Sequence, residues 1–160
     1  MILVTVGTYN HGFDRLVQPM DELAALLDEK VIIQRGGSKY EPHHAEHFQW
    51  TTGQGMAELT HQARLVVTHA GAGSIILALQ YSKPLVVVPR LSCFNEMTDD
   101  HQLQLAKAME NEGRAIVVHE PSVIQLKNAL EEAQKKEQRI SNHRQQLVSA
   151  LQQQLKQWEY

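Results

Sequence analysis

Short runs of apolar, mostly β-branched residues recur along the chain and are separated by longer amphipathic stretches. Five of these runs read ILVTV, VIIQ, LVVTH, PLVVVP and AIVV, at residues 2–6, 31–34, 65–69, 84–89 and 115–118. β-Branched residues favour strands, and LVV, LVVV and AIVV lack the alternating polar residues of a half-exposed strand. The pattern predicts strands that are covered on both faces.

Helical periodicity fills the intervals between these strands. We expect a further strand at 48–51, a loop over 35–47, and helices over 13–29, 56–63, 74–81 and 99–113. Strands that alternate with helices form parallel β-α-β units. The sequence therefore predicts an α/β fold with a doubly wound parallel sheet, in one domain that spans residues 1–120.

The pattern changes after residue 120. Residues 122–160 contain no glycine and predict one or two long helices, with apolar residues at helical spacing: Leu126, Leu130, Ala133, Ile140, Leu147 and Leu151. We treat residues 121–160 as a C-terminal helical extension. Two interpretations remain open. The extension packs on the chain's own sheet, or it docks on a partner, where Trp158 and Tyr160 would suit an interface.

Composition narrows the class of protein. A chain of 160 residues with 42% apolar and 21% charged residues is typical of one soluble globular domain. A net charge of −3 argues against nucleic acid as the partner, because no basic excess neutralises phosphates. The single cysteine, Cys93, fits a reducing compartment. Neither a signal peptide nor a membrane-spanning run is visible, so we expect a cytoplasmic protein.

The stretch HAGAGS, residues 69–74, joins a predicted strand to a predicted helix. In open α/β sheets ligands bind at the carboxyl ends of strands, and the first N–H groups of a helix lack partners and lie at its positive end. Gly71, Ala72 and Gly73 keep side chains away from this backbone, and Ser74 adds a hydroxyl. The turn predicts a diphosphate cradle, with a turn built for packing as the alternative. His69 either donates to a phosphate or satisfies a backbone carbonyl.

A second polar cluster, within residues 89–102, follows the strand at 84–89. Asp100 and Gln102 offer the acceptors and donors that sugar hydroxyls need. Arg90 is a candidate anion contact, and Glu96 a candidate contact to a ribose or sugar diol. A helix cap by Asp99 or Asp100 explains one acid, but not an acid, an imidazole and an amide side by side.

Three histidines lie close together at positions 43, 44 and 47. His43 and His47 would share one face of a helix, as zinc ligands often do. Pro42 and the preceding Gly-Gly-Ser indicate a loop instead, and no third ligand is evident. We therefore predict no metal site.

The motifs VTVGT, THAGAGS and KPLVVVPR…NE…DDHQ occur in this order within residues 1–120. Together they resemble the C-terminal, donor-binding half of glycosyltransferase family 28, which has the GT-B fold. The resemblance is strongest to the family's small stand-alone subunits. These include the catalytic subunit of the two-part N-acetylglucosaminyltransferase of lipid-linked oligosaccharide synthesis, and bacterial counterparts in exopolysaccharide and capsule synthesis. It implies a Rossmann-like domain, one half of a GT-B enzyme, that binds a UDP-sugar.

The resemblance implies roles for the residues around the nucleotide. The turn at residues 71–74 would hold the diphosphate, and the backbone of Thr52 and Gly53 would read the uracil. Several family members carry an acid for the ribose where this chain has Leu77. The ribose would then be read by Glu96 or by a partner chain.

It also implies roles around the sugar and the cleft. Asp100, His101 and Gln102 would face the donor sugar, and Gly7 and Thr8 would border the catalytic cleft. The expected chemistry is a single displacement at the anomeric carbon with inversion. A helix N-terminus would stabilise the departing UDP in place of an obligatory metal, so no cofactor is expected.

A GT-B enzyme closes two domains around its cleft, and this sequence holds only one of them. In the family's split members the acceptor half is a separate, membrane-anchored subunit. The resemblance therefore implies such a partner, a lipid-diphosphate-linked acceptor and a location at the cytoplasmic face of a membrane. An unpaired apolar cleft face could also drive self-association. The catalytic base is open: His11 is a candidate, with a solvated loop histidine as the alternative.

Two other functions fit the same motifs. A nucleotide-sugar epimerase or hydrolase of GT-B fold would consume the donor without an acceptor, although such enzymes usually carry both domains in one chain. A non-catalytic UDP-sugar-binding module would keep the cradle and lose transfer. The intact DDHQ argues against that last interpretation.

Overall fold

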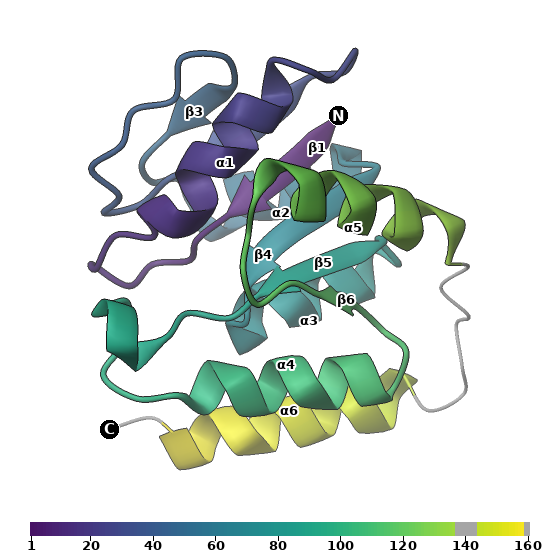
Figure 1. Ribbon diagram of the computed structural model, residues 1–160. Helices are drawn as coiled ribbons and strands as arrows, with labels where there is room; N and C mark the ends of the chain where they lie inside the picture. Colours follow the sequence, from purple (N-terminus) through teal and green to yellow (C-terminus); the bar gives the residue numbers. More distant parts are fainter. Residues whose placement is uncertain (137–143, 159–160) are drawn as a thin grey trace.

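Six parallel strands form the centre of the part of the chain that the computed structural model describes, residues 1–136 and 144–158 (Figure 1). Their order across the sheet is β3-β2-β1-β4-β5-β6. In this order the connections run outward in both directions from the β1–β4 pair, as in the Rossmann fold. The predicted doubly wound α/β sheet is confirmed.

The central strands owe their stability to burial on both faces. Val4 of β1 is fully buried and lies beside Ile33 of β2 and Val67 of β4 in the parallel register. All the residues of β4 and β5 are buried, which explains why their sequences show no polar alternation. The strands are β1 (Ile2–Thr5), β2 (Val31–Gln34), β3 (Glu46–Phe48), β4 (Leu65–His69), β5 (Leu85–Val88) and β6 (Ile116–Val117).

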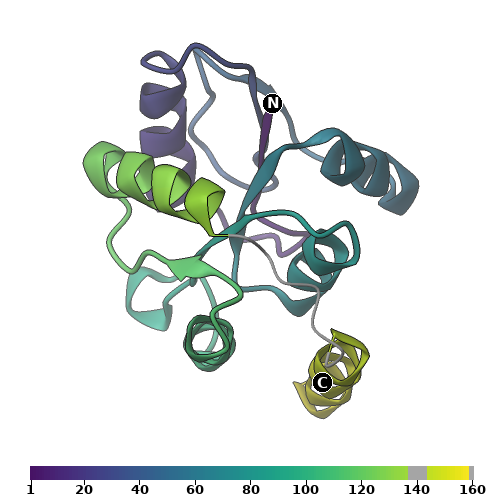
Figure 2. The same cartoon turned by 90° about the vertical axis from the view of Figure 1, so that its right-hand side faces the viewer.

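Helices cover both faces of this sheet (Figure 2). Apolar residues of α1 (Asp14–Ala24) and α5 (Val123–Lys135) share one core with β1, β2, β4 and β5. The second core lies under α2 (Gly53–Gln62), α3 (Ala72–Gln80), α4 (His101–Asn111) and α6 (Arg144–Trp158). A short 3₁₀ turn, η1 (Ser92–Phe94), lies in the loop between β5 and α4.

Several element boundaries differ from the sequence prediction. The predicted strand at 48–51 is wrong: β3 ends at Phe48, and residues 49–52 form a loop. Helix α2 begins at Gly53, earlier than expected, because Thr52 Oγ1 accepts a hydrogen bond from the Gly55 N–H (3.0 Å). Helix α1 ends at Ala24 rather than continuing to residue 29. These differences bring the loop before α2 next to the ends of β1 and β2.

The C-terminal extension forms α5 and α6. Ser122 caps α5, and Leu126, Leu130 and Ala133 are buried in the core that α5 shares with α1. Leu151 of α6 is buried in the other core and packs with α3 residues. The proposed interface role of the Trp158 and Tyr160 side chains falls outside the described residues. Among the helices described, none has the length and apolar character needed to cross a membrane.

Candidate functional site

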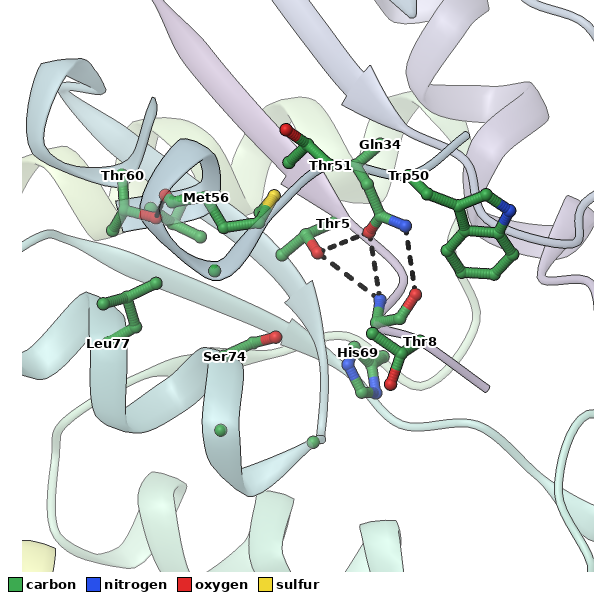
Figure 3. A pocket seen from close by; sticks show the side chains of 15 residues that line it. Thr5, Thr8, Gln34, Trp50, Thr51, Met56, Thr60, His69, Ser74 and Leu77 are labelled. Atoms are coloured by element: carbon green, nitrogen blue, oxygen red, sulfur yellow. Dashed lines mark hydrogen bonds between the residues drawn. The ribbon is translucent and has the colours of Figure 1, made fainter. Parts of the chain in front are cut away.

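A cavity of about 320 Å³ opens where β1 and β4 end, at the switch point of the sheet. In Figure 3, Met56, Thr60 and Leu77 lie at one end of this pocket, and Thr8 and His69 lie at the other. Ser74 lies between them. The predicted site residues that line the pocket are Gly7, Thr8, Gly53, His69, Gly71, Gly73 and Ser74.

The N-terminus of α3 forms one wall of this pocket. Gly71 is the N-cap residue, and no side chain hydrogen-bonds to the first turn from that position. The first intrahelical bond is donated by Ile75 to the Gly71 carbonyl, so the N–H groups of the preceding turn have no helical partner. The Ser74 hydroxyl lies on the same wall. This wall carries the partial positive charge of a helix N-terminus and suits an anion.

Gly73 and Gly71 differ in what an added side chain would meet. A Cβ on Gly73 would meet no atom within 4 Å, so the cradle is open at this residue. A Cβ on Gly71 would collide with the His69 imidazole, and so would one on Gly7, which has φ +78°. Gly71 is therefore needed for packing, and Gly73 leaves the cradle accessible. The packing interpretation therefore holds for Gly71, and the diphosphate cradle stays a prediction.

His69 is held as a neutral imidazole between these two glycines. Its side chain is 8% exposed, and Nδ1 lies 3.1 Å from the amide nitrogen of Gln102. Burial and the nearby Arg90 charge lower the pKa of His69 to about 3, although the Gln102 contact acts in the opposite direction. The imidazole therefore adds no positive charge to the pocket at neutral pH.

Gln34 fixes the loop that forms the opposite wall. Its Oε1 accepts hydrogen bonds from the Thr5 hydroxyl (2.7 Å) and from the Val6 and Gly7 N–H groups (3.1 and 3.2 Å). Its amide nitrogen donates to the carbonyls of Gly7 (3.0 Å) and Gln49 (2.9 Å). Figure 3 shows the bonds from Gln34 to Thr5 and Gly7. One buried amide thus ties the glycine of VTVGT to the segment that precedes Trp50.

The end of the pocket near α2 is mostly apolar. Met56 and Leu77 lie there with Thr60, whose hydroxyl donates to the Met56 carbonyl (2.7 Å). Trp50 is 49% exposed and also lines the pocket. No carboxylate lines this pocket within the described ranges, which agrees with Leu77 standing where relatives are expected to carry an acid.

Arg90 has a different role from the expected anion contact. Its side chain is fully buried and donates to the carbonyls of Val6 (2.7 Å), His11 (3.0 Å), Gly12 (3.2 Å) and Glu96 (3.2 Å). Burial lowers the pKa of Arg90 to about 10, so it stays charged at neutral pH. The guanidinium holds the loop after β1 against the loop after β5 and does not line the pocket.

Glu96 also serves the framework instead of a ribose. It is 5% exposed, forms an ion pair with Arg15 (2.8 Å) and accepts from the Leu91 N–H (3.0 Å). Arg15 in turn donates to the carbonyls of Pro89 and His119. This network joins the ends of β5 and β6 to α1, and it explains the burial of a carboxylate that sequence reasoning assigned to the ligand.

The residues at the start of α4 divide between framework and surface. Asp100 is the N-cap residue of α4 but makes no side-chain capping bond, whereas Asp99, one residue earlier, accepts from the His101 N–H (3.1 Å) and lies 2.9 Å from its ring Nδ1. Asp100 accepts from the Ser92 N–H (3.0 Å), which lowers the pKa of Asp100. Gln102 is buried beside His69. None of the residues 100–102 lines the pocket, and their predicted contact with a sugar stays a prediction.

Two further predicted residues lie beside the pocket without lining it. Thr52 is exposed and caps α2, and Ala72 is buried in the first turn of α3. His11 lies in the loop after β1, with Nδ1 3.0 Å from the Asn95 carbonyl. Because a carbonyl only accepts, Nδ1 carries the proton and Nε2 is the basic nitrogen. The role of His11 as a catalytic base stays a prediction.

Sequence reasoning missed about half of the pocket wall. The residues are Thr5, Gln34, Trp50, Thr51, Met56, Thr60 and Val66. A polar residue that ends an apolar run, as Gln34 ends VIIQ, was an available signal. No comparable pattern identifies Met56 or Thr60, which reach the pocket because α2 packs beside α3. Across the described residues, no group of three or more His, Cys, Asp or Glu side chains is arranged to hold a metal ion.

Known proteins similar to this chain include curated UDP-N-acetylglucosamine transferase subunits. ALG13 of Homo sapiens is 36% identical over 124 residues, which cover 70% of this chain and 10% of that protein. ALG13 of Yarrowia lipolytica is 30% identical over 122 residues, which cover 68% of this chain and 60% of that protein. The chain thus spans only part of each of these relatives.

Solved glycosyltransferase structures share the fold. The glycotransferase of kitacinnamycin superposes with a TM-score of 0.64 at 22% identity, over 98% of this chain and 39% of that one. MurG of Acinetobacter baumannii superposes with a TM-score of 0.58 at 21% identity, over 95% of this chain and 49% of that one. The Rossmann-like sheet is therefore the fold of one half of a GT-B glycosyltransferase.

The sequence model of one domain family covers almost the whole chain. The glycosyltransferase family 28 C-terminal domain matches residues 1–157, including the extension after residue 120. The turn at residues 71–74, the switch-point pocket and the shared fold agree with this match. The chain belongs to the glycosyltransferase family 28 C-terminal domain family.

Proposed function

We propose that this chain is the donor-binding, catalytic subunit of an inverting UDP-sugar glycosyltransferase. The observation that carries the proposal is the uncapped N-terminus of α3, which faces a switch-point pocket beside a neutral His69. Such a wall holds a diphosphate through backbone N–H groups and the helix dipole. The names of the similar transferase subunits support N-acetylglucosamine as the donor sugar.

The nucleoside would occupy the part of the pocket near α2. The backbone of Thr51 and Gly53 offers polar groups to a uracil, and the exposed face of Trp50 suits stacking with a base. The ribose would meet Leu77, with no carboxylate for its hydroxyls in the described lining. Nucleotide selectivity would then rest on the base.

Transfer requires an acceptor oxygen to attack the anomeric carbon from the face opposite to UDP. As the new bond forms, the bond to the β-phosphate oxygen breaks, and UDP leaves with its electron pair. The α3 N–H groups and the His69 ring would stabilise that charge, which their position in the pocket wall supports. His11 is our candidate for the base that takes the acceptor's proton, through the Nε2 left basic by the Asn95 contact.

The acceptor would be bound mainly by a second chain. The relatives are named as subunits of a transferase, and the described pocket is bordered by only one Rossmann-like sheet. We propose that a membrane-associated partner supplies the other half of the cleft and a lipid-diphosphate-linked acceptor for polysaccharide synthesis. The chain would then work at the cytoplasmic face of the membrane.

The test is calorimetric titration of the purified chain with UDP, UDP-N-acetylglucosamine and ADP, without added metal. We expect UDP to bind at least tenfold more tightly than ADP. Equal affinities for UDP and ADP would contradict the proposal. So would a failure of UDP to bind both to the chain alone and to the chain purified with its membrane partner.

Substitution of Gly73 tests the cradle itself. Gly73→Asp places a carboxylate against the diphosphate and should abolish UDP binding. Because a Cβ at Gly73 meets no atom and an acid in the first turn of a helix is favourable, the melting temperature should not fall. Gly73→Ala is the matched control without charge and should retain most of the affinity. Wild-type UDP affinity in Gly73→Asp would refute the assignment of the cradle.

A further inference from the structure

The orientation of the Gln102 amide follows from its two neighbours. The Arg90 backbone N–H lies 3.0 Å from Gln102 Oε1 and can only donate. The carbonyl end of the amide must therefore face Arg90, and the NH₂ end faces His69. Gln102 is 7% exposed, so it has no room to exchange these partners for water.

This orientation decides the protonation of His69. An amide NH₂ is only a donor, so His69 Nδ1 must accept and carries no proton. A neutral imidazole then has its proton on Nε2. Within residues 1–136 and 144–158, Nε2 has no hydrogen-bond partner. It lies on the ring edge that Gly7 and Gly71 leave uncovered, next to the pocket.

We propose that Gln102 is a positioning residue that holds His69 in the Nε2–H tautomer, so that the ring presents an N–H donor to the cradle. The proposal rests on the proposed function for the identity of the anion, the donor's diphosphate. It assigns Gln102 a role that differs from the sugar contact implied by the family resemblance. Both functional ends of its amide are already used, by Arg90 and by His69.

The tautomer can be measured in the chain without ligand. Long-range ¹H–¹⁵N NMR of ¹⁵N-histidine-labelled protein distinguishes a protonated from an unprotonated ring nitrogen, and His69 is assigned through correlations to its own Cβ. We expect an unprotonated Nδ1 and a protonated Nε2 at pH 7. A proton on Nδ1 in the wild-type chain would overturn the proposal, whatever the outcome of any binding experiment.

Gln102→Glu tests whether the Gln102 amide determines the tautomer of His69. The carboxylate still accepts from the Arg90 N–H, but it offers His69 an acceptor where the amide offered a donor. The carboxylate requires an N–H donor on Nδ1, so in a neutral ring the proton moves to Nδ1 and Nε2 presents a lone pair to the phosphate. The binding comparison is made at a pH at which the ¹⁵N spectrum of the variant shows a neutral His69 ring. UDP affinity should fall at least tenfold. Gln104→Glu makes the same charge change at an exposed position of the same helix, and its UDP affinity should stay within twofold of that of the wild type.

UDP without a sugar separates positioning from sugar contact. If Gln102 acted only on the sugar, Gln102→Glu would weaken the binding of UDP-N-acetylglucosamine and leave UDP unchanged, which would overturn the proposal. His69→Gln provides the second comparison, because its amide carries a donor that has no tautomer. In that background Gln102→Glu should change UDP affinity less than threefold.

An equal loss in both backgrounds would mean that Gln102 does not act through His69, and would also overturn the proposal. Failure of wild-type UDP binding, alone and with the partner, would instead count against the proposed function. The NMR result would still decide the tautomer in that case.

Discussion

Buried polar side chains at the strand ends set the geometry of the pocket. Gln34 forms hydrogen bonds that join the ends of β1 and β2, and Arg90 forms hydrogen bonds that join the loops after β1 and β5. Gln102 forms a hydrogen bond with the His69 ring. Each side chain also uses its amide or guanidinium group to bond backbone groups that have no partner in the sheet, just beyond the carboxyl ends of the strands. The loops are thereby fixed before a ligand arrives, which lowers the entropy that binding would cost.

The buried His69 should make stability depend on pH. Burial lowers its pKa from 6.5 to about 3, so below pH 6.5 the unfolded chain binds a proton that the folded chain does not. Stability is therefore lost as the pH falls from 6.5 towards 3. From pH 7 to pH 5 this group alone should cost about 2 kcal/mol.

Urea unfolding of the wild type and of His69→Asn at the two pH values measures this contribution. The variant should lose less stability over the interval, by about the same 2 kcal/mol. The pKa of the carboxylate of Asp21 is also lowered, but it titrates below its ordinary value of 3.8 and contributes little at pH 5. Parallel pH profiles for the two proteins would contradict a neutral buried His69.

The sequence identified residues whose role is local and missed those whose role is distant. The small residues of the turn at 71–74 and the glycine of VTVGT shape the backbone of their own turns. A local sequence pattern is therefore enough to indicate them. Gln34 meets Gly7, 27 residues away, and Arg90 meets Val6, 84 residues away. Only the fold creates those contacts, which is why Arg90 and Glu96 could be recognised as polar residues of the site region but not as its framework.

At the level of elements, one carboxylate fastens the long segment between β2 and β3 to α1. Asp21 is fully buried and accepts from the N–H groups of His43, His44 and Ala45 and from the Tyr40 hydroxyl, at 2.8–2.9 Å. Burial alone would raise the pKa of Asp21, but these four hydrogen bonds lower it below its ordinary range. The histidine segment considered as a zinc site is thus a loop anchored through its backbone.

Asp21→Asn should therefore be strongly destabilising. The amide keeps the shape but turns an NH₂ group toward backbone donors, leaving buried groups unsatisfied at a cost of about 3 kcal/mol. Asp28→Asn, an exposed acid shortly after the same helix, is the control and should have almost no effect. Denaturant unfolding measures both variants. A cost below about 1 kcal/mol for Asp21→Asn would show that the loop does not depend on this carboxylate.

Element boundaries depended on caps more than on periodicity. The apolar spacing placed most helices and strands correctly, yet α2 begins at Gly53 because Thr52 caps it, and FQWT is mostly loop. The Trp and Thr residues of FQWT have high strand propensity. The pairing of β3 with β2 instead uses Glu46–Phe48 and leaves Trp50 at the pocket. The conformation of this segment was thus determined by its pairing with β2 and not by strand propensity.

At the scale of the whole molecule, a doubly wound parallel sheet could be predicted, whereas its strand order and the position of the last helix could not. Apolar runs that alternate with helices allow few topologies, and the switch-point pocket follows from them. The extension after residue 120 fits either a core-packed helix or a helix on a partner, because both require the same apolar stripe. In the structure α6 contacts α3, the helix whose N-terminus lines the pocket.

This contact makes α6 part of the fold that supports the site. Leu151 is 4% exposed in the core that contains Ile75 and Leu79 of α3. Leu151→Ala should reduce the free energy of unfolding of the isolated chain by about 2–4 kcal/mol, whereas Leu26→Ala, at a position 71% exposed, should change it by less than about 0.5 kcal/mol. Denaturant unfolding without any partner measures both. If α6 served only to dock on another chain, Leu151→Ala would leave the isolated chain as stable as Leu26→Ala does, and its cost would appear only in the assembled enzyme.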